Sequence, residues 1–319
     1  MAGVPRTLIV SCLLLLAACA SRRSDIPVPS TRQDTVAAIK RAERKLGFED
    51  TANFRGADPG QKAFYRCYYT GKLELPASYD ELDLRYGDES GCPVDESEYD
   101  LFFYKIEAVA SGDVGVSEAL EESTIERFAV VVSHEDFHDD PQVQRLPTRI
   151  GEAATTLIGF LTAARFASTE YGAESETFRN LDREADLYLR KSRLVNDYYE
   201  RLSRLYDDFR AKRVNREEAL AKKAELYGEI QRACEAIEPN PTSFNKCLTA
   251  NNNAGLAFEI TYTRFYPLVF ELHQTLGGDT RRTIAALREA GDLGTDSEER
   301  TASALRRKIT AATASTGGS

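Results

Sequence analysis

Histidine and tryptophan are scarce in this chain: its 319 residues include three histidines, no tryptophan and one methionine. Basic residues are also in the minority, with 41 Lys and Arg against 51 Asp and Glu, which gives a net charge of −10. Because phosphate binding requires clustered Lys and Arg, and no such cluster occurs, the composition argues against a nucleic-acid partner. The six cysteines contain no CxxC pair, so their spacing does not indicate a zinc knuckle.

The N-terminal sequence MAGVPRTLIVSCLLLLAAC resembles a bacterial lipoprotein signal, because one positive charge precedes a short apolar run that ends in LAAC. The run is too short for a stable membrane span. The resemblance implies that residues 1–18 are removed and that Cys19 is acylated. Ala20 implies sorting to the outer membrane, with the protein facing the periplasm, and residues 19–32 form a tether. The alternative is an ordinary secretory signal.

Four further cysteines follow the signal, namely Cys67, Cys92, Cys234 and Cys247. An even number of cysteines in an exported protein predicts two disulfides. Proximity in the chain favours the pairs Cys67–Cys92 and Cys234–Cys247. Because four cysteines allow three pairings, the sequence leaves the pairing open.

The first half of the chain is expected to hold a small β portion between helices. A helix follows the tether with Asp34 as its cap, and residues 58–72 are expected to form a second, short helix. The aromatic-rich stretch 73–115, which includes YDLFFYKIEAVA, predicts the β portion. The fold is therefore expected to be mainly α (α+β) in one domain over 33–310, followed by a disordered tail at 311–319.

The second half is expected to be almost wholly helical. Ser123 is a plausible cap for a helix through STIERFAVVVSHEDFH, and residues 149–167 read as a buried helix. The charged amphipathic stretch 176–214 is predicted to pair with 215–237 as a long helical hairpin. Residues 251–278 are expected to form the next helix.

Two of the three histidines lie in the motif HEDFH, at residues 134–138. In a helix, His134 and His138 lie one turn apart on the same face, so both can bind one metal ion. Glu135 can then reach a metal-bound water as general base. The alternative is a solvated acidic helix. The third histidine, His273, is expected to be packed or on the surface.

The motif, with Glu152 fourteen residues after His138, resembles gluzincin-type HExxH metallopeptidases of zincin-like fold. The resemblance implies one Zn²⁺ ion held by His134, His138 and Glu152, the last in the first turn of an adjacent helix. Ala153 and Ala154 would allow the two helices to approach closely. Two alternatives stay open: the aspartates at 139 and 140 as rival ligands, and Glu152 as a charge that favours a helix N-terminus.

A closer resemblance is to the bacterial family called predicted aminopeptidases. It is carried by HEDFH, GEAATTLI, RLSRLYDDFRAKRVNREEALAKKAELYGEI and NNNAGLAFEITYTRFYPLVFELHQTLGGD, in this order over residues 128–279. The chain departs from the family at Asp136 and Phe137, where relatives have Leu and Ala, and at Gly151, where they have Asn. It therefore resembles a divergent branch, and the substrate is left open.

The resemblance implies that zinc polarises a peptide carbonyl and activates a water whose proton Glu135 accepts. Tyr262 is the candidate donor to the oxyanion, followed by Tyr266 and Arg264; the alternative is that the tyrosines are packing aromatics. The GxMxN loop that binds the substrate amine in well-known gluzincin aminopeptidases is missing, because Met1 is the only methionine.

Three functions are weighed on these residues. The first is a lipid-anchored zinc peptidase that acts on peptides in the periplasm. The second is a non-catalytic envelope lipoprotein that binds another envelope protein through the long charged helical region 174–237. The third is a metal-dependent hydrolase of non-peptide material such as the cell wall.

Overall fold

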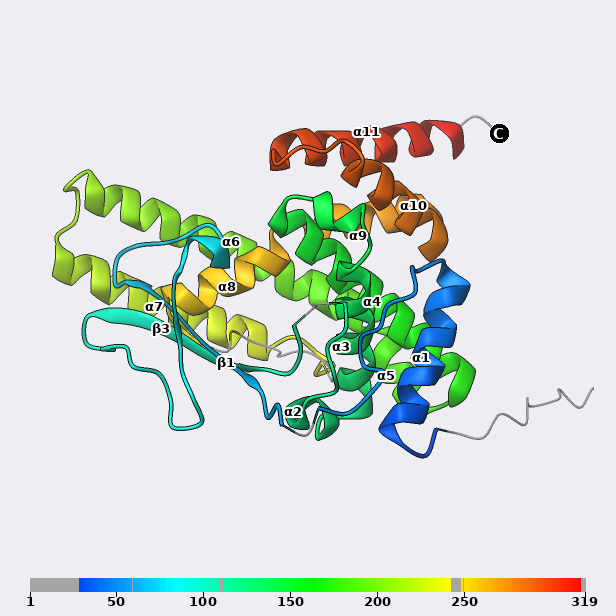
Figure 1. Cartoon of the computed structure of the whole chain (residues 1–319). Coiled ribbons are helices and arrows are strands. Elements are labelled where there is room, and N and C mark those ends of the chain that lie inside the picture. Colours follow the sequence, from blue (N-terminus) through cyan, green and yellow to red (C-terminus); the bar gives the residue numbers. More distant parts are fainter. Residues whose placement is uncertain (1–28, 59, 110–111, 242–247, 249, 317–319) are drawn as a thin grey trace, which may run out of the picture.

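The computed structural model describes residues 29–58, 60–109, 112–241, 248 and 250–316 (Figure 1). The expectation of a mainly α (α+β) fold is confirmed: helices make up most of the described chain, and one three-stranded sheet accompanies them. The predicted signal peptide, Cys19 and most of the tether lie outside the described residues.

The first helix, α1 (Arg32–Leu46), packs against the central helices α3 and α4. Its N-cap is Thr31, and Asp34 is the third helical residue, which completes a capping box with the Thr31 side chain. The predicted cap at Asp34 was therefore wrong by three residues. Gly47 ends the helix in the left-handed region, with φ of 90°, which glycine adopts without steric cost.

The sheet consists of β1 (Phe64–Gly71), β2 (Asp83–Tyr86) and β3 (Tyr99–Ile106), antiparallel in the order β2-β1-β3. The short helix predicted over residues 58–72 was wrong, because this stretch contains the central strand. Its sequence FYRCYYT is rich in aromatic residues that favour strands, and it pairs with a neighbour on each side. The short helix η1 (Tyr79–Glu81) precedes β2.

The disulfide Cys67–Cys92 confirms one predicted pair, with the two Cα atoms 5.9 Å apart. It joins the central strand to the loop between β2 and β3. Cys247 lies outside the described residues, so the pair Cys234–Cys247 stays a prediction.

The centre of the molecule is the pair α3 (Ile125–His138) and α4 (Thr148–Glu170). Thr124, rather than the predicted Ser123, caps α3 with its side chain. Most of α4 is buried, as the apolar stretch predicted. The two short helices nearby are α2 (Glu118–Glu121) and η2 (Val143–Arg145), of which η2 lies in the connection between α3 and α4.

The predicted hairpin is present as α6 (Glu184–Arg210) and α7 (Arg216–Glu235), which lie side by side and extend away from the helical body in Figure 1. The chain from 176 to 214 is two helices rather than one, because α5 (Glu176–Asp182) ends before α6 begins. The hairpin has its own apolar core, which includes residues of α8.

Four helices complete the described chain: α8 (Asn253–Thr263), α9 (Tyr266–Thr275), α10 (Thr280–Gly291) and α11 (Glu298–Thr316). The single helix predicted over 251–278 is divided, because Pro267 lacks an N–H and is suited to the first turn of a new helix. The tail boundary predicted at 311 was also wrong, since α11 continues to Thr316. Among the described helices, none is both long and apolar enough to span a bilayer.

Candidate metal centre

The HEDFH motif forms the last turn of α3, where i and i+4 residues share one face. The Nε2 atoms of His134 and His138 lie 3.1 Å apart, and both residues line a cavity of about 480 Å³. The side chain of His134 is 9% exposed and that of His138 is 24% exposed. The motif therefore presents both imidazoles to the cavity from one helix.

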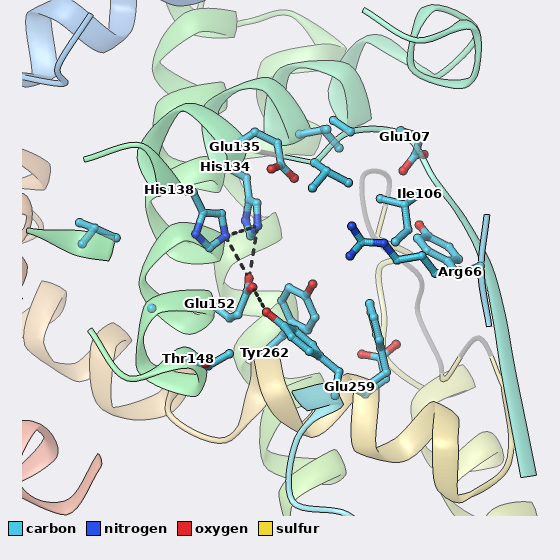
Figure 2. Close-up of a pocket in the computed structure, with 18 of the residues that line it drawn as sticks. Arg66, Ile106, Glu107, His134, Glu135, His138, Thr148, Glu152, Glu259 and Tyr262 are labelled. Atoms are coloured by element: carbon cyan, nitrogen blue, oxygen red, sulfur yellow. Dashed lines mark hydrogen bonds and ion pairs between the residues drawn. The ribbon is translucent and has the colours of Figure 1, made fainter. Parts of the chain in front are cut away.

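Glu152 faces the histidines from the neighbouring helix α4. Its Oε2 lies 3.5 Å from His134 Nε2 and 3.1 Å from His138 Nε2 (Figure 2). Glu152 is the fifth residue of α4, so it lies just past the first turn in which it was predicted. It still meets both histidines, so the structure brings together the three side chains that the sequence singled out.

Gly159 allows α3 and α4 to approach closely, two turns beyond Glu152. A Cβ atom at this position would lie 3.2 Å from the carbonyl oxygen of Val130 and 3.3 Å from Cβ of His134. Ala153 and Ala154, which were expected to provide this approach, are also buried. The signal for the approach, a glycine inside a strongly apolar helical run, is visible in the sequence.

The geometry of the cluster fits a tetrahedral ion. Zinc bound at roughly 2.0–2.1 Å by ligands at tetrahedral angles would place their donor atoms roughly 3.4 Å apart. The observed separations are 3.1, 3.1 and 3.5 Å. Two imidazoles and one carboxylate also form a ligand set of a catalytic zinc site, which leaves the fourth position open. Among the described residues, His134, His138 and Glu152 are the group of this kind.

The carboxylate of the cluster is ionised, which is the form that binds a metal ion. Burial opposes ionisation of Glu152, but the charge of His138 and hydrogen bonds with both imidazoles outweigh it and lower its pKa. Burial lowers the pKa of His138, and the charge of Glu152 outweighs this and raises the pKa to about 9. Without an ion, a proton on His138 therefore compensates the buried Glu152 carboxylate.

Tyr79 holds the second oxygen of Glu152. Its hydroxyl donates a hydrogen bond to Glu152 Oε1 at a distance of 2.7 Å. Burial and the adjacent carboxylate raise the pKa of Tyr79 far above its ordinary value, so the phenol stays a donor. Sequence reasoning missed this residue, because it lies 73 positions before Glu152, at the start of the short helix η1, in a stretch with no motif.

Asp136 and Phe137, the departures from the family pattern inside HEDFH, face away from the cavity. Asp136 pairs with Lys40 and accepts hydrogen bonds from Thr51 and Asn53 in a buried polar network. The ring of Phe137 is fully buried against Phe48, with centroids 5.1 Å apart. These two residues pack behind α3 and do not line the cavity.

The two rival aspartates have other partners. Asp139 lines the cavity and accepts a hydrogen bond of 2.5 Å from Asn53. Asp140 is bound by Arg288 and caps the backbone N–H groups of Gln142 and Val143. Neither belongs to the three-residue cluster.

Glu135 and Tyr262 both line the cavity, as a general base and an oxyanion donor would. The ring of Tyr262 lies 6.3 Å from the ring of His134, centroid to centroid. Burial and the charge of Glu152 raise the pKa of Tyr262 well above its ordinary value, so its hydroxyl keeps its proton.

Tyr266 and Arg264, the two reserve candidates, lie elsewhere. Tyr266 is fully buried and donates a hydrogen bond to the carbonyl of Ala185. Arg264 pairs with Glu200 and does not line the cavity. Tyr266 lies apart from Tyr262, because the chain turns between α8 and α9. His273 is packed, with Nδ1 2.9 Å from the hydroxyl of Thr283.

A comparison with protein families matches the part of the chain that contains the His134, His138 and Glu152 cluster. Residues 116–303 match the family described as "Putative aminopeptidase". This match spans more than half of the chain, so the protein belongs to that family, and the predicted aminopeptidase resemblance is confirmed. No curated protein and no solved structure matches the chain.

Proposed function

We propose that this protein is a lipid-anchored, zinc-dependent metallopeptidase of the gluzincin type that hydrolyses peptide bonds in the bacterial periplasm. The observation that carries the proposal is the convergence of His134, His138 and Glu152 on a cavity that Glu135 also lines. Membership of an aminopeptidase-like family supports the choice of peptide as substrate.

His134, His138 and Glu152 would hold the ion, and Tyr79 would hold Glu152. When bound, zinc supplies Lewis-acid chemistry: it polarises a carbonyl and lowers the pKa of a water to about 7. A hydrogen bond to a ligand carboxylate fixes its orientation, and loss of such a partner typically weakens metal binding by roughly 10- to 100-fold. Tyr79 is therefore assigned a positioning role.

Glu135 is assigned the role of general base. It directly follows the ligand His134 on α3, and Figure 2 shows its carboxylate beside the two imidazoles at the cavity wall. From this place Glu135 would take the proton of the attacking water and pass it to the leaving amine. Tyr262, protonated and on the same cavity, would donate a hydrogen bond to the oxyanion.

The anchor part of the proposal is supported by the N-terminal sequence. Cys19 follows a lipoprotein-type signal, and the polar residues up to the start of α1 would separate the lipid from the folded domain. Several acyl chains on one residue give stable attachment to a membrane.

The proposal predicts different effects of two substitutions in the cavity. Wild-type protein should retain about one zinc ion per chain and cleave peptides from a broad synthetic library. Glu135→Gln should retain zinc and lose at least roughly 100-fold in kcat, because general-base catalysis contributes this much. The primary effect of Glu152→Gln should be the loss of zinc, since the substitution removes the negative charge of a ligand.

Metal content by mass spectrometry and cleavage rates should be measured together. Glu126→Gln is the matched control, because Glu126 is on the same helix and its side chain accepts a hydrogen bond from Asn180 outside the cavity. Protein without zinc, or full activity in Glu135→Gln, would contradict the proposal. Bound zinc without cleavage of any peptide would favour the non-catalytic scaffold instead.

A further inference from the structure

Besides the histidines, three basic side chains line the cavity, and two of them are neutralised within the protein. Arg127 forms two hydrogen bonds with Glu107, of 2.7 and 2.8 Å. Lys191 pairs with Glu259 at 2.9 Å. The Lys191–Glu259 pair is buried and the Arg127–Glu107 pair is partly buried. Both pairs belong to the cavity lining, so each adds little net charge for a ligand to meet.

The third cation, Arg66, has no acidic partner among the described residues. Its guanidinium donates one hydrogen bond, to the hydroxyl of Tyr68 at 3.3 Å. Figure 2 shows the Arg66 guanidinium extending into the cavity, across from His134, His138 and Glu152. A half-buried guanidinium has five N–H groups, so most of its donors are left for a ligand.

The surroundings of Arg66 strengthen binding of an anion. Tyr68, Tyr104 and Phe258 line the same wall, with ring centroids of Phe258 5.5 Å from Tyr68 and 6.3 Å from Tyr104. Aromatic surroundings lower the local polarity and so increase the attraction between opposite charges. Arg is also the residue that matches a carboxylate with two parallel hydrogen bonds.

We propose that Arg66 binds a carboxylate of the peptide substrate, while the scissile bond lies at the metal ligands. The inference rests on the proposed peptidase function and names one feature of its substrate. In the reverse orientation, the substrate carboxylate would lie beside His134, His138 and Glu135. The negative charge of Glu135, which lines that end of the cavity, disfavours this orientation. The carboxylate is either the C-terminal α-carboxylate or an Asp or Glu side chain, and both present the same two oxygens.

The test uses zinc-loaded, full-length protein and two sets of synthetic peptides. The first set is di- to hexa-alanine, each with a free C-terminal carboxylate and as its C-terminal amide. The second set is amidated hexa-alanine with one Glu, or one Gln, at each position in turn. A preference within the first set identifies the α-carboxylate as the ligand, and a preference within the second set identifies a side chain.

Wild type should cleave the preferred carboxylate peptides with a higher kcat/KM than the matching peptides that lack the carboxylate. Arg66→Gln should reduce this value by roughly 10- to 100-fold, the range for one lost hydrogen bond to a charged group, mainly through KM. The matching amides should be unaffected. Arg66→Lys, which keeps the charge without the two-pronged geometry, should lie between. Lys105→Gln is the matched control, because Lys105 is exposed on the neighbouring strand and does not line the cavity.

Binding of the same peptides to zinc-loaded Glu135→Gln protein, measured by calorimetry, separates this inference from the proposed function. Carboxylate-dependent binding without cleavage by wild type would support the role of Arg66 and overturn the peptidase proposal. Cleavage and binding that do not distinguish carboxylates from amides would support the peptidase and overturn the role of Arg66. An equal loss for carboxylate and amide peptides in Arg66→Gln would overturn it as well.

Discussion

Glu43 illustrates how a single residue can depend on the packing behind the candidate site. It is 3% exposed on α1, and its Oε1 has no hydrogen-bond partner among the described residues. Burial raises its pKa well above the ordinary value, and the nearby charge of Asp136 raises it further, against the opposing effect of Lys40. Above pH 4.5, the ordinary pKa of a glutamate, the unfolded chain releases the proton of Glu43, whereas the folded protein retains it.

The sign of this difference gives a pH prediction. The stabilisation by neutral Glu43 is complete below the unfolded pKa of 4.5 and is lost as the pH rises toward the folded value. Glu43→Gln, which is neutral at every pH, should gain stability relative to wild type by up to about 1.4 kcal/mol per pH unit. Urea unfolding at pH 4.5, 6 and 7.5 measures this gain. The exposed control Glu225→Gln should show no such trend, and a constant difference for Glu43→Gln would contradict the prediction.

Single residues also show which parts of the candidate site can be predicted from the sequence. His134, Glu135 and His138 were predictable because a helix places i and i+4 side chains together. Tyr79 was not predictable, because its contact with Glu152 arises from the fold of a distant segment. Arg66 was hidden for the same reason, in a stretch that was expected to be a helix.

At the level of secondary structure elements, the approach of α10 to the connection between α3 and α4 depends on a glycine. A Cβ atom at Gly291 would lie 1.9 Å from the backbone oxygen of Gln142, just before η2. This connection joins His138 to the helix that carries Glu152. The last turn of α10 therefore supports the relative position of the two helices that carry the proposed ligands.

Two substitutions of glycine by alanine should have opposite effects. Gly291→Ala should destabilise the fold by about 1–3 kcal/mol, the usual cost of overpacking, and should weaken zinc binding. Gly228→Ala on α7 meets only the flexible end of Arg232 at 3.3 Å, so it should be neutral or stabilise by up to about 1 kcal/mol. Thermal unfolding and zinc titration compare the two variants. Equal stability of both would show that α10 does not support the connection.

At the scale of the whole molecule, the described fold begins at the cap of α1, well after Cys19. The proposed anchor and the proposed active site are thus separate along the chain. Changing Cys19 should alter where the protein is found and leave its chemistry intact.

Cys19→Ala, expressed in a bacterial host, should move the protein from the membrane fraction to the soluble periplasmic fraction or leave it with an uncleaved signal. Incorporation of a labelled fatty acid should be lost in the same variant, because the thiol is the acylation site. Cys12→Ala is the control that should keep both properties. Membrane attachment and labelling that survive in Cys19→Ala would rule out the proposed anchor.

The amino-acid sequence by itself determined the mainly helical class, the hairpin and the histidine pair, because these follow from local periodicity and short spacings. Tertiary structure alone decided that the stretch around Arg66 is the central strand and that Tyr79 binds Glu152. It also decided that Tyr262 lines the cavity while Tyr266 does not. Contacts between distant segments depend on how whole helices and strands pack. That packing is set by the burial of many side chains together, so no short motif records it.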